Sequence, residues 1–266
     1  HDYLMCFPNP GRCHWIKVYK LPEGGRNSRG RPINNVIQLD ENEKVSAILP
    51  VRDFHEDEYV FFATAMGVVK KVQLSAFKNV SKVGIKAIAL KEGDSLVGVA
   101  RTSGRNDIML FSNLGKAIRF NEYWERSSDD EETGDDNDTE ISGSQEDDSA
   151  ESAPISGKHG VRPSGRGSGG LRGMRLPENG RIVSLITFAP EAEESDLQVL
   201  TATANGYGKR TPIAGYPRKN KGGQGNIAIN TGERNGDLVA ATLVRDSDDL
   251  MLITSGGVLI RTKVEQ

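Results

Sequence analysis

Short runs of apolar residues alternate with turns rich in Gly, Asn, Asp and Pro along most of the chain. This pattern is typical of short β-strands, and no stretch has the spacing of a long amphipathic helix. In five places an apolar run breaks at a glycine and then resumes, usually with basic residues. These places are residues 5–11, 62–71, 110–119, 201–210 and 252–261. We therefore expect five hairpins that turn at a glycine with positive φ, as at Asn205-Gly206.

The five turn glycines indicate a repeat. They are Gly11, Gly67, Gly115, Gly206 and Gly257, at spacings of 56, 48, 91 and 51 residues. The long spacing contains an acidic tract, so the period is near 50. Further expected strands follow in each unit, at residues 33–39, 45–51, 85–90, 96–99, 171–176, 182–186, 227–229 and 238–244. About four strands in roughly 50 residues predict an all-β, propeller-like disc of four-stranded blades.

Composition divides the chain into a basic body and an acidic insert. Residues 127–156 contain 12 of the 37 acidic residues and no Lys or Arg, which leaves 25 acids against 34 basic residues elsewhere. The insert has almost no large apolar residues, so we expect it to be disordered, with a Gly/Ser-rich basic flank at 157–173. We treat residues 1–266 as a single domain with this insert. No segment has the pattern of a membrane span or a secretory signal, so we expect a cytoplasmic location.

The basic residues keep a constant phase within the repeat. Counted from each turn glycine, one group falls at positions +3 and +4 and another near +11 to +20, while acids precede the glycine by eight to fifteen residues. A single Lys or Arg is more often a solvated surface residue than a ligand contact. Recurrence in phase favours a basic belt with the acids elsewhere, and such a belt is typical of duplex DNA binding through phosphates. The candidate DNA-binding residues are Arg26, Arg29, Arg31, Lys70, Lys71, Lys78, Lys82, Lys86, Arg119, Arg162, Arg166, Arg172, Lys209, Arg210, Arg218, Lys219 and Lys221.

Other motifs carry less weight. Residues 165–170 match G-x-G-x-x-G, but no strand precedes them and no helix follows, so we expect a basic tether rather than a nucleotide site. Cys6, Cys13 and His14 lack the paired spacing of a zinc site, and we expect no metal. No pair of carboxylates and no nucleophilic triad stands out, so we expect no catalytic site in this chain.

Residues 17–39, 63–71 and 205–211 closely resemble the C-terminal domain of the DNA gyrase A protein, and the resemblance covers nearly the whole chain, with only the acidic insert and its flank outside it. It implies a six-bladed β-pinwheel that wraps duplex DNA around its rim. The family's box, Gln-Arg-Arg-Gly-Gly-Lys-Gly, is not found in this sequence. The nearest match is residues 219–225, which keep Gly222, Gly223 and Gly225, and we expect a related DNA-contacting loop there.

The resemblance also implies the work of the larger enzyme. The wrapped DNA is presented for strand passage that introduces negative supercoils, within an A2B2 heterotetramer of gyrase A and gyrase B proteins. This domain itself uses no cofactor, whereas the full enzyme uses ATP and Mg²⁺, and it acts in the cytoplasm on the chromosome. Two alternatives remain open: the equivalent C-terminal domain of topoisomerase IV, and a propeller that serves as a protein-interaction scaffold.

Overall fold

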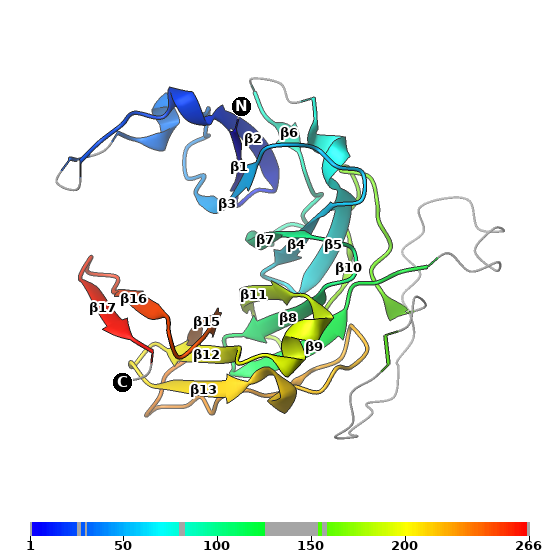
Figure 1. The fold of residues 1–266 in the computed structure, drawn as a ribbon, viewed down its shortest axis with the longest axis vertical. Helices are drawn as coiled ribbons and strands as arrows, with labels where there is room; N and C mark the ends of the chain where they lie inside the picture. Colours follow the sequence, from blue (N-terminus) through cyan, green and yellow to red (C-terminus); the bar gives the residue numbers. More distant parts are fainter. Residues whose placement is uncertain are drawn as a thin grey trace.

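The computed structural model describes residues 2–25, 28, 29, 31–79, 83–125, 154, 155 and 159–264, so most of the acidic insert lies outside the described residues. Antiparallel sheets joined by turns and short 3-10 helices make up this part of the chain, and they follow one another along an arc (Figure 1). In the described residues no helix is long and apolar enough to span a membrane. The all-β fold class expected from the sequence is confirmed.

Each sheet is a blade of the arc. The main strands are β1 (Tyr3–Pro8), β2 (Arg12–Lys17), β3 (Val45–Val51), β4 (Tyr59–Thr64), β5 (Val68–Gln73), β7 (Leu96–Thr102), β8 (Asp107–Ser112), β9 (Lys116–Asn121), β11 (Ile182–Phe188), β12 (Gln198–Thr203), β13 (Gly208–Pro212), β15 (Leu238–Val244), β16 (Asp249–Ile253) and β17 (Leu259–Lys263). Three two-residue strands complete the sheets: β6 (Ile85–Lys86), β10 (Leu171–Arg172) and β14 (Asn226–Ile227). Blade 1 has the order β3-β1-β2-β6, blade 2 β10-β5-β4-β7, blade 3 β11-β8-β9-β14 and blade 4 β13-β12-β15, and blade 5 contains β16 and β17. Five sheets are seen among the described residues, and a sixth blade stays a prediction.

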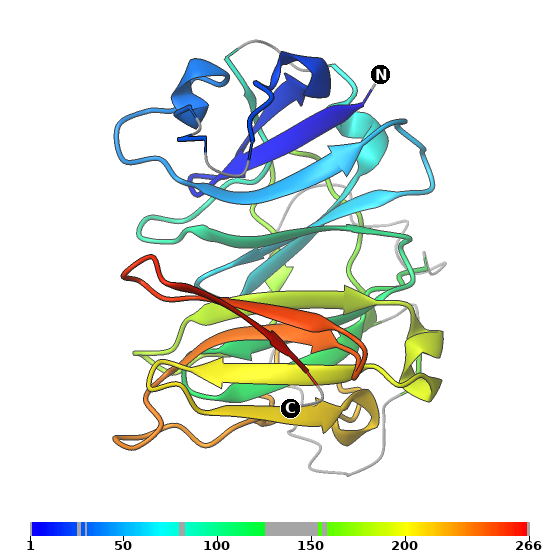
Figure 2. The same ribbon diagram turned by 60° about the vertical axis from the view of Figure 1, so that its left-hand side comes forward.

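One strand of each blade lies on the inner side of the arc. β3 packs against β7, β7 against β11, and β11 against β15. Figure 2 shows β3, β7 and β11 stacked above one another on this side. The short strands β6, β10 and β14 lie at the opposite end of each sheet and form the rim (Figure 1).

In blades 1 to 3 the rim strand comes from the next repeat unit. Cys13 pairs with Ile85, Val69 with Leu171, and Ala117 with Asn226, and each first partner is two residues past its turn glycine. The carbonyl groups of those glycines, Gly11, Gly67 and Gly115, each accept two backbone N–H bonds from the same incoming segment. Neighbouring blades are therefore joined by their backbones.

The turn glycines are required by geometry. All five have φ between 74° and 82°, as the hairpin pattern predicted. Gly67 and Gly115 are also crossed closely by the incoming segments, because a Cβ there would lie 2.5 Å from the Met174 carbonyl oxygen and 2.1 Å from that of Ile229. Any other residue would be strained in the backbone and would push the next unit away.

The hydrophobic core is divided into layers between the blades. Phe62 packs with Phe7 of blade 1, whereas its neighbour Phe61 packs with Ile108 of blade 3, and all four are fully buried. Both faces of an inner blade are therefore covered. A similar layer joins blades 3 and 4 around Phe111 and Val199.

The expected strand at residues 33–39 was wrong. This segment begins with a 3-10 turn, Ile33–Asn35, and forms no strand. Its apolar side chains instead cover Cys6 and Ile16 on the outer face of blade 1. The expected strands at 85–90 and 171–176 are real but shorter, and that expected at 227–229 is Asn226–Ile227, which begins one residue earlier. Only two residues of each incoming segment reach the register of the rim.

Candidate nucleic-acid interface

Three crossing segments carry basic residues to the rim. We name them by their units: crossing segment 2 (residues 74–88), crossing segment 3 (159–174) and crossing segment 4 (213–229). Each begins near the +4 residue of the preceding blade, as the bridges Lys71–Pro163 and Arg119–Arg218 show for the last two, and each ends in a rim strand. The basic residues that recur near +11 to +20 from each turn glycine therefore lie at equivalent places in the fold.

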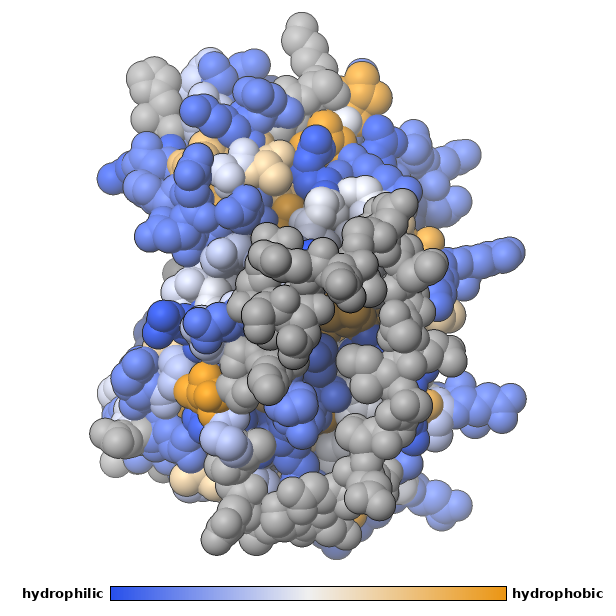
Figure 3. Space-filling model, turned by 90° about the vertical axis from the view of Figure 1, so that its right-hand side faces the viewer, coloured by the Kyte–Doolittle hydropathy of each residue, from blue (hydrophilic) through white to orange (hydrophobic). Residues whose placement is uncertain are grey.

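The crossing segments hold four of the eight candidate residues that are exposed in the described part of the chain. Lys78 and Lys86 are exposed on crossing segment 2, and Arg162 and Arg172 are exposed on crossing segment 3. Arg166, Lys219 and Lys221 are partly buried, and Lys221 donates to the His159 carbonyl over 3.0 Å. Coloured side chains on the side of the molecule where β5, β6 and β10 lie are largely hydrophilic (Figure 3). Lys82 lies outside the described residues, as does Arg26 of the first unit.

Lys70, Lys71 and Arg119, at positions +3 and +4, do not fit the predicted DNA contacts. Their exposed fractions are 1%, 2% and 2%. No phosphate can reach these side chains in this arrangement, because both faces of blades 2 and 3 are covered. We therefore remove the three residues from the candidate interface.

Lys71 joins blade 2 to blade 3. Its Nζ donates to the carbonyl of Glu122 over 2.8 Å and lies 3.9 Å from the Glu122 carboxylate, which is itself fully buried. Burial lowers the pKa of Lys71 to about 8, an effect that Glu122 opposes, and burial raises the pKa of Glu122. Thr102 and the backbone of Asn106 donate to the same carboxylate and satisfy its oxygens.

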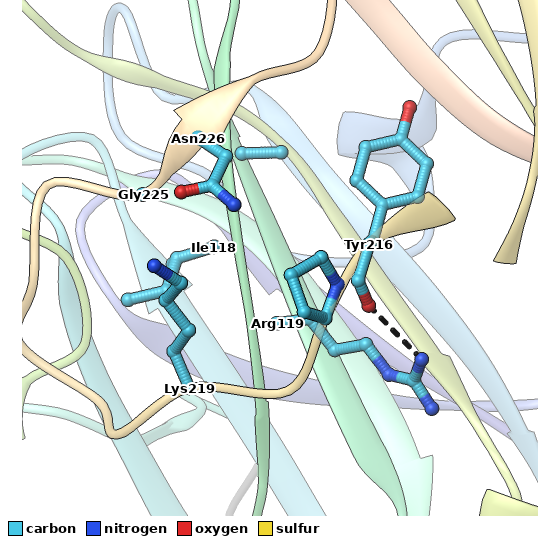
Figure 4. A pocket seen from close by; sticks show the side chains of 8 residues that line it. Ile118, Arg119, Tyr216, Lys219, Gly225 and Asn226 are labelled. Atoms are coloured by element: carbon cyan, nitrogen blue, oxygen red, sulfur yellow. Dashed lines mark hydrogen bonds between the residues drawn. The ribbon is translucent and has the colours of Figure 1, made fainter. Parts of the chain in front are cut away.

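Arg119 has a similar structural role in blade 3. Its Nε donates to Asp107 over 2.8 Å and its Nη2 to Glu193 over 2.8 Å. Its Nη1 donates to the Tyr216 carbonyl over 3.1 Å, and Figure 4 shows this third bond. Arg218 of crossing segment 4 bonds to the same two carboxylates and is drawn away from the solvent. The expectation that acids would gather away from the basic residues was wrong here.

The acids also meet basic residues in the outer units. Arg210 pairs with Asp246, and Arg261 pairs with Asp249. Lys209 and Arg210 are exposed on β13, and Arg29 and Arg31 are exposed in the first unit. A polyanion can reach all four, although at Arg210 it has to replace Asp246.

The box-like loop lies between two crossing segments. Gly222 donates to the Gly173 carbonyl, and the Gly223 carbonyl accepts from Arg175. Gly225 has φ 73°, and a Cβ there would lie 2.3 Å from the Ala117 carbonyl. It corresponds to Gly84 and Gly170, which also precede rim strands, so its glycines have a structural reason.

Position +1 is basic in two of the five units, and the sequence reasoning missed these two residues. Arg12 and Lys116 occupy it and pair in register with Lys86 and Ile227 of the rim strands. Lys116 also contacts Gln224 of the box-like loop over 3.4 Å. The signal was present, because both residues directly follow a turn glycine.

The remaining motifs have structural surroundings in the described part of the chain. Residues 165–170 direct backbone carbonyls, not N–H groups, at a buried lysine. Cys6 and Cys13 are free and buried, burial raises the pKa of both thiols, and no metal-ligating group of three or more side chains is found among the described residues. The cavity beside Lys219 and Asn226 measures about 10 Å³, which is room for one water molecule (Figure 4).

Comparison with known proteins now connects this geometry to a family. The model described as DNA gyrase C-terminal domain, beta-propeller, matches residues 2–52, 58–103, 106–123, 159–189, 198–245 and 248–266. The chain belongs to the DNA gyrase C-terminal domain family. Its matched segments leave out the whole acidic insert, as expected from the sequence, but they include residues 159–173 of the basic flank, which was expected to fall outside the resemblance.

The relatives of this gyrase domain are A proteins of DNA gyrase, a type II topoisomerase. That of Neisseria gonorrhoeae is 81% identical over all of this chain, that of Aeromonas salmonicida 47% and that of Escherichia coli K12 41%. The chain spans 26–29% of the length of these relatives.

Solved structures agree on the fold. A gyrase A C-terminal domain aligns with a TM-score of 0.72 at 22% identity, covering 100% of this chain and 73% of that one. The C-terminal domain of a topoisomerase IV aligns with a TM-score of 0.76 at 24% identity, covering 99% and 70%. At these identities the structural likeness shows the fold alone.

Proposed function

We propose that this domain binds duplex DNA along its rim, without sequence specificity, and wraps it across successive blades. The observation that carries the proposal is the recurrence of exposed basic residues on the crossing segments that end in β6 and β10. A third crossing segment, which ends in β14, holds partly buried basic residues at the equivalent place. Equivalent segments lie at equivalent places on successive blades, so a backbone that follows the rim meets one basic segment after another. Contacts of this kind are made to phosphates, which carry no sequence information directly.

Wrapping requires many such contacts. Bending a duplex of 20–30 base pairs by 40–90° costs about 1–6 kcal/mol, and phosphate contacts spread over several blades offset that cost. The exposed Lys78, Lys86, Arg162 and Arg172 form the centre of the proposed interface. Arg29, Arg31, Lys209 and Arg210 extend it toward the two ends of the arc.

We further propose the place of this domain in the larger enzyme. As part of a gyrase A protein, it presents the wrapped segment for strand passage and negative supercoiling by an A2B2 assembly with gyrase B. ATP and Mg²⁺ belong to that assembly and not to this domain. The support for this step is the identity to gyrase A proteins across the whole chain.

Salt dependence tests the binding. The logarithm of the binding constant should fall against the logarithm of salt concentration with a slope of about −0.9 for each phosphate contacted. A slope near zero would refute the proposed DNA binding through phosphates.

Topology tests the wrapping. A nicked circular plasmid is bound, ligated and freed of protein, and its linking number is compared with that of plasmid ligated alone. A protein-dependent shift supports chiral wrapping, whereas binding without a shift would restrict the proposal to DNA holding.

A protein-interaction scaffold is the second candidate, because several apolar side chains on β16 and β17 are exposed. Charge reversal at Lys78, Lys86, Arg162 and Arg172 distinguishes the two functions. Unchanged DNA affinity in that variant would favour the scaffold.

A further inference from the structure

Lys70 has an unusual environment for a charged residue. It lies on β5 at position +3 and is 1% exposed. Its Nζ donates to three backbone carbonyls, those of Ala87 over 3.1 Å, Arg166 over 2.8 Å and Ser168 over 2.8 Å. In the described part of the chain no carboxylate forms an ion pair with it. The ammonium group is therefore held by the main chain of two crossing segments.

These three bonds join two neighbouring parts of the rim. Ala87 directly follows Lys86 on the rim of blade 1, whereas Arg166 and Ser168 belong to crossing segment 3. Lys86 and Arg166 lie near enough to Lys70 that, after burial, their charges are the next causes that lower its pKa to about 8. The carbonyl of Arg166 and that of Ala87, which directly follows Lys86, both lie within 3.1 Å of the Lys70 Nζ, so the main chain brings Lys70, Lys86 and Arg166 to one place at the boundary between blades 1 and 2.

Comparison of the blades shows why a lysine stands here. At position +3 in blade 1, His14 lies beneath Gly84, where a Cβ would be 2.6 Å from the ring. In blade 3, Ile118 faces Gly223 of crossing segment 4. Each side chain is directed at the crossing segment of the next unit, so position +3 is where a blade holds that segment.

Crossing segment 3 needs the strongest hold. It contains the run from Gly165 to Gly170, and a Cβ at Gly165 or Gly167 would meet nothing within 4 Å. Glycines without packed neighbours have many accessible backbone conformations, and ordering them costs more entropy than ordering other residues. Lys70 supplies two hydrogen bonds to this run, and Ser168 adds two of its own, to Ser164 and to the Gly165 carbonyl.

Resting on the proposed DNA binding, we infer that Lys70 is a positioning residue, which ties crossing segment 3 to the rim of blade 1 and so holds Lys86 and Arg166 together as a single phosphate-binding site. Lys70 itself does not touch the phosphate. A bound phosphate relieves the repulsion among three cations that form no ion pair with an acid of the described residues. The site lies at a blade boundary, where a wrapped backbone has to pass from one blade to the next.

The first experiment tests the tie without DNA. Amide hydrogen exchange is measured over residues 164–171 in the full chain and in Lys70→Met, which keeps the length of the side chain. Faster exchange of this segment by on the order of tenfold is expected, with the exchange of β8 and β9 unchanged. Lys209→Met is the matched control, because Lys209 has the same phase in blade 4 but is exposed. Equal exchange in Lys70→Met and the unmodified chain overturns the inference.

The second experiment tests the shared site with surface variants that leave the core intact. Lys86→Gln and Arg166→Gln should each reduce the steepness of the salt dependence by about 0.9, and together by about the same amount, since they serve one phosphate. In the Lys70→Met background this non-additivity of Lys86→Gln and Arg166→Gln should be lost, whereas in the Lys209→Met background it should remain. A purely structural role for Lys70 would not produce this pattern.

The two experiments separate the possible failures. Additive effects of Lys86→Gln and Arg166→Gln in the unmodified chain overturn the shared site, even if Lys70→Met does not fold. Faster exchange in Lys70→Met together with no DNA binding by the unmodified chain would refute the proposed function and leave the tie intact. Thermal unfolding of each variant shows whether it is folded under the conditions of the test.

Discussion

At the scale of single residues, the buried cations are the main departure from the sequence-based picture. Neighbouring positions on a strand point to opposite faces, so Lys70 and Lys71 would be expected to leave at least one side chain in solvent. Both are buried because blades cover each face of blade 2. The continuous run of apolar residues in β4 carried this information, since strands buried on both faces lose the alternation of polar and apolar positions.

The buried ammonium groups make stability depend on pH. The pKa of Lys70 is lowered to about 8, first by burial, whereas a lysine in an unfolded chain has a pKa of about 10.4. Between these values the unfolded chain binds the proton and the folded chain does not, so the free energy of unfolding rises with pH in this window. Lys70→Met removes the contribution of Lys70 to this pH dependence. Urea unfolding measures the free energy of unfolding of the unmodified chain and of the variant. The excess of the unmodified chain over the variant should grow by on the order of 1–2 kcal/mol between about pH 8 and pH 10. A constant difference over that range would contradict the assignment.

The ion pairs of Asp107 should be worth far more than those at the surface. Asp107 is fully buried and holds Arg119, Arg218 and Asn121. Asp107→Asn leaves the Arg119 charge incompletely paired, and we expect a loss of about 3–5 kcal/mol of unfolding free energy. The matched control is Asp246→Asn, because Asp246 pairs with Arg210 on the surface and should cost less than about 1 kcal/mol. Equal losses of unfolding free energy in the two variants would show that the buried ion pairs of Asp107 stabilise the fold no more than a surface ion pair does.

At the scale of elements, the exchange of rim strands explains which strands could be predicted. Strands that pair within their own unit, such as β3 and β15, have the boundaries expected from the sequence. The rim strands have only two residues each, and their partners lie in another unit, so local pattern could not set their ends. Residues 33–39 have the same apolar pattern but pack on a face of blade 1. The prediction failed here because the pattern alone does not distinguish a strand that pairs within a sheet from a segment that covers its face.

The turn glycines provide a test of this exchange. A Cβ at Gly115 would lie 2.1 Å from the Ile229 carbonyl, whereas a Cβ at Gly257 meets nothing within 4 Å, although both have φ near 80°. Gly257→Ala should cost about 1–2 kcal/mol from backbone strain alone. Gly115→Ala should cost at least about 2 kcal/mol more, because crossing segment 4 must also move. Unfolding in denaturant measures both, and similar costs would mean that close passage at Gly115 is unimportant.

At the scale of the whole molecule, the repeat was the most informative feature of the sequence. The spacing of five glycines predicted the number of hairpins. The phase of the second basic group predicted that its residues share one place in the fold, and that place is the crossing segments. The phase argument failed for Lys70, Lys71 and Arg119 because one phase can correspond to an interior position as well as to a surface. Only the packing of blade against blade decides between the two.

The described residues on either side of the acidic insert lie beside crossing segment 3. The backbone N–H of Val161 donates to the Glu122 carbonyl over 3.1 Å, so the residues that flank the insert lie side by side. Arg162 lies over the Trp124 ring at 5.4 Å, at the beginning of crossing segment 3. The chain can therefore be shortened here without separating two elements of blade 3.

Removal of residues 127–156 should tighten DNA binding. The deletion removes 12 acidic and no basic residues, and a polyanion attached next to crossing segment 3 competes with DNA for the same cations. The gain in affinity should be largest at low salt and should shrink as salt rises, because screening weakens the competition. A second variant replaces the 12 acids with Asn and Gln at constant length, and it should reproduce the gain if charge is the cause. Affinity unchanged in both variants would leave the insert as a passive linker, whereas a gain in the deletion alone would point to its bulk rather than its charge.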